Sequence, residues 1–337
     1  MALKLLQAIA GAPHGGAETF FVRLAGAFQR DGDDQRVLMR RDPARAKELR
    51  SAGVEVVETG FGGRLDLATR LTFRRQVASF RPDIVLTWMS RATRFCPRGK
   101  YVHLARLGGY YDLKYFGHCD HLIGNTRTIV DYAVKHGWSR NRVHYLPNFV
   151  PDPGPRRRPE RDGNIRVVAL GRLHPNKGFD VLLDALAQAP GIDLRIAGDG
   201  DLLAPLRAQA ERIGIGRRVR FMGWQDNVWP LLDTADFLVC PSRHEPLGNV
   251  VIEAWAAGVP VIATATDGPA SLIADGDDGL LVPADDATAL AETMTRLAAD
   301  ATLRGRLAAA GRASYEERFT EAAVVGRYHE LFERVTR

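Results

Sequence analysis

Short apolar segments alternate with helical segments along most of the chain, and this alternation limits what the sequence can fold into. Residues 236–240 (DFLVC) have the pattern of a buried strand, a helix follows and ends at Gly258, and residues 259–263 (VPVIA) form a second apolar run. Buried strands separated by helices are typical of a parallel sheet with helices on its faces. The sequence therefore predicts an α/β fold built from strand–loop–helix–strand units.

A polar segment rich in proline and arginine, residues 151–164 (PDPGPRRRPERDGN), separates two such alternating series. A chain of 337 residues, 45% of them hydrophobic, is long enough to bury two cores, and two domains are the usual arrangement at this length. We therefore expect a first domain over residues 1–150, a linker with a hinge over 151–164, and a second domain over 165–318.

Composition limits the cellular compartment in which the protein is expected to work. No uncharged apolar run reaches about eighteen residues, so no membrane-spanning helix is expected. Residues 1–13 (MALKLLQAIAGAP) read as a buried first strand that leads into a glycine-rich loop rather than as a signal peptide. Three scattered cysteines, Cys96, Cys119 and Cys240, suit a reducing cytosol and lack metal-ligand spacing. We expect a cytoplasmic protein.

The charge is unevenly distributed. Residues 1–150 carry 24 Lys and Arg against 13 Asp and Glu, a net charge of +11, and the remainder has a net charge of −5. The first half therefore attracts anions such as nucleic acid, anionic lipid or a phosphorylated acceptor, although solvated arginine faces are an equal alternative. The expected helix over 65–80 carries Arg70 and Arg74 opposite Leu67 and Leu71, and it could rest on an anionic membrane or face solvent.

Two carboxylates, Glu245 and Glu253, flank the start of the helix in the second domain, with seven residues between them. Leu247, Gly248 and Asn249 open this helix, and the first N–H groups of a helix have no intrahelical acceptor. Together with the helix dipole they favour a bound anion, which we interpret as a diphosphate. Glu245 would lie beside the group on the phosphate, and Glu253, about two turns further on, would reach another part of the ligand. The alternative is an ordinary helix with two exposed glutamates.

A basic loop follows the first strand of the second domain. Residues 165–171 (IRVVALG) end at a glycine, and the next loop carries Arg172 and Lys177 before an amphipathic helix begins at Phe179. Arginine makes forked contacts with phosphate and lysine acts as a point charge, so both residues can reach one diphosphate. A solvated loop is the alternative.

These two elements resemble a known enzyme family. Residues 245–254 (EPLGNVVIEA) resemble the E-x7-E signature of the retaining glycosyltransferases of family 4, and residues 171–178 (GRLHPNKG) match the GRL...KG element of the same family. The resemblance covers nearly the whole chain and implies the GT-B fold, in which two Rossmann-like domains face each other across a cleft. It also implies that the last helix, over 319–337, packs back on the first domain.

The resemblance implies an activity and roles for residues. Family members move a sugar from a nucleoside-diphosphate donor to an acceptor alcohol and keep the anomeric configuration, and no metal ion or cofactor is implied. Arg172 and Lys177 would neutralise the leaving diphosphate, Glu245 would position the sugar hydroxyls, and Glu253 would take the ribose hydroxyls. Since no side-chain nucleophile is evident, the implied route is a front-face displacement in which a diphosphate oxygen takes the acceptor proton.

Glycine loops supply further substrate-binding candidates. Gly15 and Gly16 precede a helix and resemble the GG-x-E loop that lies near the donor diphosphate and the acceptor in the family; a simple turn is the alternative. Met222 and Gly223 lie in a segment similar to the family strand that meets the nucleotide base. No G-x-G-x-x-G fingerprint follows the first strand, which argues against a nicotinamide oxidoreductase.

The triplet from Asp199 to Asp201 spells D-x-D, the metal motif of a different glycosyltransferase fold. Here it follows a strand and precedes a helix. We interpret Gly198 and Gly200 as giving room for the donor and the aspartates, Asp199 among them, partly as a helix cap. No dependence on magnesium is expected. Further along, residues 267–269 and 275–283 are rich in Asp, Gly and Pro, and we expect turns and a hairpin there.

The acceptor side is expected in the first domain. A buried strand is expected over 83–88 (DIVLTW), and its end, residues 88–91 (WMSR), should line the cleft. Family members often place a histidine that contacts the sugar at the end of the next strand. Here His103 lies within that strand and Arg106 nearer its end, so either could make this contact, and a structural role for a buried His103 is favoured. Two histidines and a cysteine at 118–121 lack a matching ligand pair, so no metal is expected.

Residues 106–116 (RLGGYYDLKYF) are similar to bacterial lipopolysaccharide-core transferases and suggest a saccharide or lipid-linked saccharide acceptor, with the protein at the inner face of the cytoplasmic membrane. Two alternatives remain open: an epimerase or phosphorylase on the GT-B scaffold, and a non-catalytic anion-binding protein. Nucleic acid is not an expected partner, because no recognised nucleic-acid module is present.

Overall fold

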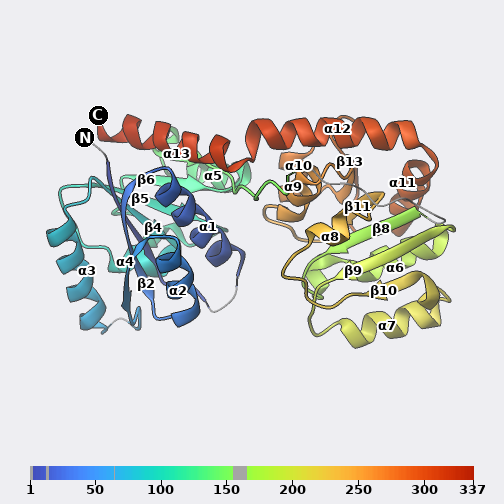
Figure 1. Ribbon diagram of the computed structural model, residues 1–337, viewed down its shortest axis with the longest axis horizontal. Helices are drawn as coiled ribbons and strands as arrows, with labels where there is room; N and C mark the ends of the chain where they lie inside the picture. The colour runs from blue at the N-terminus through green and yellow to red at the C-terminus, as the bar shows by residue number, and fades with distance from the viewer. Residues whose placement is uncertain (1–2, 13–14, 64, 155–164) are drawn as a thin grey trace. The chain divides into compact units, whose positions relative to one another are not determined.

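The computed structural model describes residues 3–12, 15–63, 65–154 and 165–337, so most of the expected linker lies outside the described residues. The chain divides into two compact units. Unit 1 comprises residues 1–148 and 321–337, and unit 2 comprises residues 149–320. Each unit is built on one parallel sheet with helices packed against its two faces, as Figure 1 shows.

The sheet of unit 1 has seven strands in the order β3-β2-β1-β4-β5-β6-β7, and every neighbouring pair is parallel. After β3 the chain returns to the other side of β1, and this reversal of strand order is typical of Rossmann-like sheets. The strands are β1 (Lys4–Ile9), β2 (Asp34–Arg40), β3 (Glu55–Thr59), β4 (Ile84–Trp88), β5 (Val102–Leu107), β6 (His121–Gly124) and β7 (Val143–Tyr145).

The helices of unit 1 connect these strands and include the last helix of the chain, which packs on α1. They are α1 (Gly16–Arg30), α2 (Pro43–Ser51), α3 (Leu67–Phe80), α4 (Met89–Phe95), α5 (Arg127–Lys135) and α13 (Glu321–Thr336), with short 3-10 turns η1 (Leu113–Tyr115) and η2 (Arg140–Arg142).

The sheet of unit 2 repeats this topology with six parallel strands in the order β10-β9-β8-β11-β12-β13. The strands are β8 (Ile165–Leu170), β9 (Ile192–Ala197), β10 (Val219–Phe221), β11 (Phe237–Cys240), β12 (Val261–Thr264) and β13 (Leu280–Val282). The helices are α6 (Phe179–Gln188), α7 (Leu203–Arg212), α8 (Trp229–Leu232), α9 (Asn249–Ala256), α10 (Asp267–Leu272), α11 (Ala287–Ala299) and α12 (Ala301–Arg318), with η3 (Pro175–Lys177) and η4 (Gly216–Arg218).

Alternate residues of the strands bury apolar side chains on opposite faces of the sheet. In β8, Val167 and Ala169 join the cluster under α6, α7 and α11, whereas Val168 and Leu170 join the cluster that contains Trp255. A strand that is apolar on both faces is expected in a parallel sheet covered by helices. The predicted α/β class with two Rossmann-like domains is therefore confirmed.

Two local predictions were wrong, and one helix was not predicted. Residues 275–283 do not form a hairpin: β13 pairs parallel with β12, and residues 267–272 form α10 between these strands. Residues 89–95 form α4, a helix that the sequence did not predict, directly after the strand that ends at Trp88. The helix expected from residue 65 begins at Leu67, because the Asp66 carboxylate accepts the Thr69 N–H and caps it.

Candidate active site

The loops at the carboxyl edge of the unit 2 sheet are tied together by backbone contacts. The N–H groups of Arg243 and His244, after β11, donate to the Asn176 carbonyl, after β8, at 2.8 and 3.1 Å. The N–H of Gly268, after β12, donates to the Glu245 carbonyl at 2.8 Å. Since ligands of open parallel sheets bind at this edge, these loops form the candidate site.

Lys177 and Glu245 meet at the centre of this group of loops. The Lys177 ammonium donates to Glu245 Oε2, and the other carboxylate oxygen, Oε1, accepts the Gly248 N–H at 3.3 Å. Glu245 is 9% exposed, so its charge is balanced inside the protein by the ammonium and an N–H at the start of α9. The structure thus brings three of the predicted residues together, although 68 residues separate Lys177 from Glu245.

Two buried hydroxyls that the sequence analysis did not single out support Glu245. The Ser242 hydroxyl donates to Glu245 Oε2 at 3.4 Å, and the Thr264 hydroxyl, at the end of β12, donates to the Ser242 carbonyl at 2.5 Å. Both side chains are nearly fully buried. The sequence could have indicated both residues by their position, because each is a small polar residue at or just after the end of an apolar strand.

Arg243 fixes the rim of the site by bridging three loops. Its guanidinium makes a forked contact with Asp180 at 2.8 and 2.6 Å and donates to Asp285 at 2.5 Å and to the Pro175 carbonyl at 2.9 Å. The same hydrogen bond lowers the pKa of Asp180, and the pairing raises the pKa of Arg243. Sequence reasoning missed this residue, because its partners lie 63 and 42 positions away.

Two glycines allow the loops to approach each other closely. Gly178 has φ +63°, and a Cβ there would lie 2.1 Å from the Pro241 carbonyl oxygen. Gly198 has φ +151°, and a Cβ there would lie 1.8 Å from the Gly171 carbonyl oxygen. Backbone atoms cannot yield as a flexible side chain can, so both positions require glycine.

The loops after β9 and β10 join the same edge. The Gly198 N–H donates to the Gly223 carbonyl at 2.8 Å, and the Leu173 N–H donates to the Asp199 carbonyl at 2.9 Å. The structure therefore places the predicted positions 198–200 and 222–223 next to the loop that carries Arg172 and Lys177. Met222 itself is exposed.

The helix cap predicted at 199–201 was wrong. Helix α7 begins at Leu203, its cap position is Leu202, and no side chain caps it. The Asp199 carboxylate instead accepts the N–H of the next residue, Gly200, at 2.8 Å. Gly198 and Gly200, with φ +151° and +150°, lie on either side of Asp199, and the helix begins two residues beyond Asp201.

The remaining predicted donor residues lie near this centre without joining it. Arg172 follows Gly171 directly, and its exposed side chain makes no hydrogen bond or ion pair with the described residues. Leu247 is buried just before α9. Asn249 and Glu253 lie one turn apart in α9, so they share a face of this helix, and both are partly exposed.

In unit 1, the predicted glycines at 15 and 16 open α1, with Gly15 as its cap residue. The Glu18 carboxylate folds back and accepts the Ala12 N–H at 2.8 Å, and it would meet a Cβ placed on Gly15 at 2.2 Å. Glu18 is buried although it belongs to the first turn of the helix. The loop thus holds a carboxylate at the carboxyl edge of β1.

His103 and Arg106, the two candidates for an acceptor contact, are buried inside unit 1. Arg106 is 2% exposed; its guanidinium donates to the Tyr328 hydroxyl at 2.7 Å and to Asn148 Oδ1 at 2.8 Å, and it lies over the rings of Phe20 and Trp88. These contacts hold α13 against the sheet. The geometry favours a structural role for Arg106, and its contact with a ligand stays a prediction.

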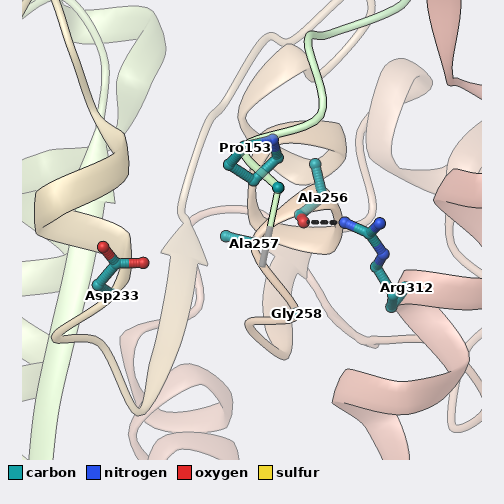
Figure 2. Close-up of a pocket in the computed structure, with 7 residues that line it drawn as sticks. Pro153, Asp233, Ala256, Ala257, Gly258 and Arg312 are labelled. Carbon is teal, nitrogen blue, oxygen red and sulfur yellow. Dashed lines mark hydrogen bonds between the residues drawn. The ribbon is translucent and has the colours of Figure 1, made fainter. Parts of the chain in front are cut away.

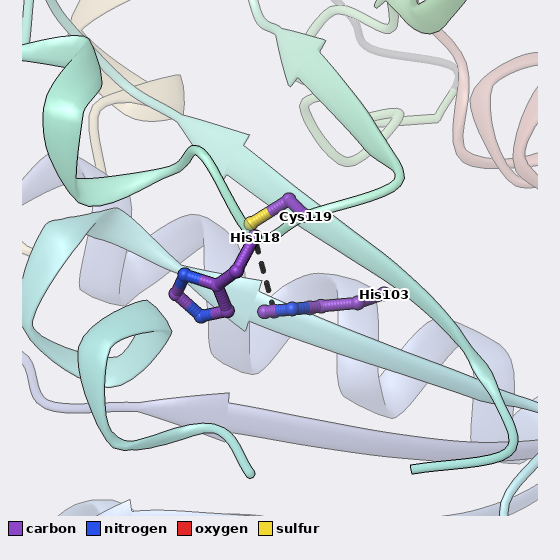
Figure 3. A group of neighbouring side chains, drawn as sticks. All are labelled: His103, His118 and Cys119. Carbon is purple, nitrogen blue, oxygen red and sulfur yellow. Dashed lines mark hydrogen bonds between the residues drawn. The ribbon is translucent and has the colours of Figure 1, made fainter. Parts of the chain in front are cut away.

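His103 belongs to a cluster that the sequence spacing did not reveal. Potential ligand atoms of His103, His118 and Cys119 all lie within 4.8 Å of one another, and Figure 3 shows the three side chains converging. His103 Nε2 is 2.9 Å from the Thr87 hydroxyl, and His118 Nε2 is 3.1 Å from the Thr93 carbonyl.

The electrostatics of this cluster favour a neutral core. Burial, with a smaller effect of His118, lowers the pKa of His103 to about 3, and burial raises the pKa of the Cys119 thiol. His103 Nε2 already has the Thr87 hydroxyl at 2.9 Å and Cys119 Sγ at 3.9 Å as hydrogen-bond partners. The donor atoms therefore suit a hydrogen-bonded core better than a metal site.

A small pocket on unit 2 lies near the start of the expected linker. Figure 2 shows its lining, in which Arg312 donates to the Ala256 carbonyl. The same guanidinium pairs with Asp152 at 2.7 Å. Arg312 is thus an anchor for the first residues of the expected linker, and the pocket contains none of the predicted substrate-binding residues.

Comparisons with known proteins agree with this architecture. A family model described as Glycosyl transferases group 1 matches residues 155–314, and one described as Glycosyltransferase Family 4 matches residues 14–152. The lipopolysaccharide core biosynthesis glycosyltransferase LpsE of Rhizobium meliloti is 34% identical over 326 residues, which cover 94% of this chain and 95% of the relative.

Solved structures show the same fold. A glycosyltransferase from Rickettsia africae superposes with a TM-score of 0.89 at 16% identity, covering 100% of this chain and 99% of the other. The HepE protein of Anabaena in complex with UDP-glucose superposes with a TM-score of 0.80 at 19% identity, covering 98% of this chain and 100% of the other. At these identities the likeness concerns the fold alone.

Proposed function

The chain belongs to the family 4 glycosyltransferases with the GT-B fold, and from this premise we propose that it moves a sugar from a nucleoside-diphosphate donor to a saccharide acceptor with retention of configuration. The observation that carries the proposal is the meeting of Lys177, Glu245 and the Gly248 N–H at the carboxyl edge of the unit 2 sheet. A cation, an anion and a helix start within one small site suit a ligand that has a charged diphosphate next to a polar sugar.

The proposed chemistry divides the work among these groups. The leaving diphosphate gains charge as the bond to the sugar breaks, and Lys177, Arg172 and the N–H groups at the start of α9 stabilise that charge. Glu245 orients the sugar hydroxyls. Because its carboxylate is already held by Lys177, Ser242 and Gly248, it acts as a fixed hydrogen-bond acceptor. Glu253, one turn into α9, takes the ribose.

We propose that the reaction needs no metal ion. The positive groups just named supply the charge that a divalent cation would otherwise provide. The aspartates at 199 and 201 do not support a metal site, because Asp199 accepts the Gly200 N–H and no described cluster of possible metal ligands includes either residue. Full turnover after treatment with EDTA is the expected result, and loss of turnover restored by Mg²⁺ would contradict it.

The similarity to LpsE supports an acceptor from the lipopolysaccharide core, taken at the inner face of the cytoplasmic membrane. In the described residues no helix is long and apolar enough to cross a bilayer. Three exposed leucines lie at the start of α3, namely Leu65 (90% exposed), Leu67 (73%) and Leu71 (50%), and we propose that they touch the membrane surface. Replacing Leu67 and Leu71 by Ser should reduce co-sedimentation with vesicles that contain phosphatidylglycerol, and undiminished co-sedimentation would contradict this contact.

A thermal-shift screen with UDP-, GDP- and ADP-sugars tests the donor site. A ligand at a hundred times its Kd adds about 2.7 kcal/mol of stability, which is readily detected. One donor class should stabilise the protein, and the UDP-glucose in the HepE complex makes UDP-sugars the first choice. An absence of stabilisation by any nucleotide sugar would refute the proposal.

An epimerase on the same fold is the alternative to a transferase. Incubation with the stabilising nucleotide sugar and no acceptor separates the two. A transferase hydrolyses the donor slowly and leaves the sugar configuration unchanged, whereas an epimerase converts the sugar. Proton NMR of the product distinguishes these outcomes and, once an acceptor is found, also reports whether the anomeric configuration is retained.

A further inference from the structure

Unit 1 has a second cluster of functional side chains, at the carboxyl edge of its own sheet. A cavity of about 450 Å³ is lined by eight residues. They are Arg40, Phe61, Gly62, Gly63, Arg70, Arg91, Arg94 and Phe95. We propose that this arginine pocket binds a phosphate or diphosphate ester carried by the acceptor saccharide, and this rests on the proposed transferase function.

The position of the pocket follows from the topology of the sheet. Arg40 is the last residue of β2, Phe61 lies two residues after β3, and α4, which carries Arg91 and Arg94, directly follows β4. These are carboxyl ends of parallel strands, where sheets of this class bind their ligands. The volume is also in the range of small-molecule sites, roughly 300–1,000 Å³.

The four arginines have no acidic partner among the residues that the structure describes. Within the described residues, none of their guanidiniums forms an ion pair or a side-chain hydrogen bond; Arg70 lies over the Phe95 ring at 5.5 Å and Arg94 over the Tyr115 ring at 5.1 Å. Many other arginines of unit 1 are paired, as in Arg30 with Glu321, Arg36 with Glu55 and Arg140 with Asp131. Four like charges around one cavity repel each other, and a bound anion would relieve that repulsion.

Asp66, on the turn next to Gly62, forms no ion pair with the four arginines in the described residues. Asp66 accepts the N–H groups of Gly62 and Thr69 and the Thr69 hydroxyl, at 2.8, 2.9 and 2.6 Å. Its oxygens are thus committed to the turn before α3 and to the cap of that helix. The arginines are left to an external ligand.

The floor of the pocket is rigid and apolar. Phe61 is fully buried and packs edge to face on Phe95 with the ring centroids 5.6 Å apart. Phe61 has φ +43° and Met89, the first residue of α4, has φ +60°, conformations that non-glycine residues rarely adopt. Strained backbone of this kind concentrates at functional sites, and here it positions Arg91 and Arg94.

The chemistry of the pocket favours a phosphate ester over other anions. Guanidinium groups bind phosphate in a forked geometry, and four of them match the charge of a diphosphate or of two phosphates better than that of one carboxylate. The ester could belong to a free phosphosaccharide or to a lipid-linked one, since both present the same group.

Isothermal titration of the full chain with inorganic pyrophosphate, at 150 mM salt, tests the pocket. The wild type should show two sites, one in each unit. Arg91→Ala with Arg94→Ala should weaken the unit 1 site at least tenfold and keep the other. Lys177→Ala should do the reverse, so a failed donor site and a failed arginine pocket give different patterns. The matched control is Arg74→Ala with Arg75→Ala, which removes the same charge from exposed positions of α3 outside the pocket and should change the affinity less than twofold.

Three results would overturn the proposal: a single site that only Lys177→Ala abolishes, equal losses in the pocket variant and its charge-matched control, or glucuronate binding more tightly than either phosphate probe. Two further arms separate the sources of the ester. A pocket for a free phosphosaccharide binds glucose 6-phosphate in the absence of lipid. A pocket for a lipid-linked ester shows little affinity for it and an Arg91- and Arg94-dependent affinity for phosphatidic acid vesicles. Binding of neither probe contradicts the assignment.

Discussion

Unit 1 and unit 2 have the same sheet topology, but the charged residues at the carboxyl edges of their two sheets are arranged differently. In unit 2, the cation and the anion at the strand ends are paired with each other, as Lys177 is with Glu245. In unit 1, four arginines line a cavity and have no acidic partner in the described part of the chain. The interiors differ as well, because unit 1 buries a polar network around Arg106 and His103 beside the apolar side chains of its core. The comparison teaches that the fold fixes where a ligand binds and that the loop residues fix which ligand it is.

The largest effect is expected from breaking the charge pair of unit 2. Lys177→Ala and Glu245→Ala should each lower turnover by about 10²–10³, since one fixed charge or donor at a reacting group contributes that much. Thermal melts should show that both variants fold, with a lowered melting temperature because each substitution leaves the other member of the pair without its partner. Leu203→Met, at the start of α7, is a control for substitution within the same unit. Normal turnover in either charge variant would remove the basis for the contrast between the units.

The next effect concerns the close packing of the unit 2 loops. Gly198→Ala places a Cβ against the Gly171 carbonyl and forces φ +151° on alanine, so the free energy of unfolding should fall by about 3 kcal/mol and nucleotide-sugar affinity should drop. Gly305→Ala is the matched control, because a Cβ at this helical position meets nothing within 4 Å. It should be neutral or slightly stabilising. Urea unfolding measures both, and equal stabilities would contradict the argument.

A smaller effect is expected in the polar network of unit 1. Tyr328→Phe removes the acceptor of the Arg106 Nε–H. Because Arg106 is only 2% exposed, water cannot replace that acceptor, and the free energy of unfolding should fall by about 2 kcal/mol. Tyr315→Phe removes a buried hydroxyl of unit 2 that donates to the Val150 carbonyl at 3.1 Å, and it serves as the comparison. Hydrogen exchange followed by mass spectrometry should show faster exchange of α13 only in the first variant.

The smallest effect is a pH dependence confined to unit 1. Burial lowers the pKa of His103 to about 3 and that of His144 to about 4, with smaller effects of neighbouring His and Arg side chains. The native state therefore holds both rings neutral, whereas the unfolded chain protonates them below its ordinary pKa of about 6.5. Their contribution to stability is complete above pH 6.5 and is lost as the pH falls from there toward 4. Urea unfolding between pH 7.5 and 5 should show a shallower slope for His144→Gln, and an unchanged slope would contradict this account.

Local sequence patterns predicted most strands and helices, because a buried strand such as residues 165–170 is recognised by its continuous apolar run. They did not predict strand partners. Turn residues around Gly276 and Gly279 suggested a hairpin, yet β13 pairs with β12, and turn chemistry carries no information about that distant partner. Helix α4 was missed because seven residues without a side-chain cap give little periodicity.

Single motifs identified which residues belong to the candidate site, but they did not predict which of these residues contact each other. The spacing of Lys177 and Glu245 from their helices pointed to a ligand, but their direct pairing depends on two loops 68 residues apart. The arginine pocket shows the same limit. Arg40 was visible only as part of a net charge of +11 over residues 1–150, and Arg91 as part of a strand end expected to line the cleft. The topology of the sheet brings them to one cavity.

The assignment of the donor to unit 2 and not to the arginine pocket is the central claim. It is tested most directly by the shift in melting temperature that a saturating nucleotide sugar produces in three proteins. The account predicts a full shift in the wild type and in the Arg91→Ala, Arg94→Ala variant, and a lost shift in Lys177→Ala. A full shift in Lys177→Ala, or its loss in the arginine variant, would contradict the account.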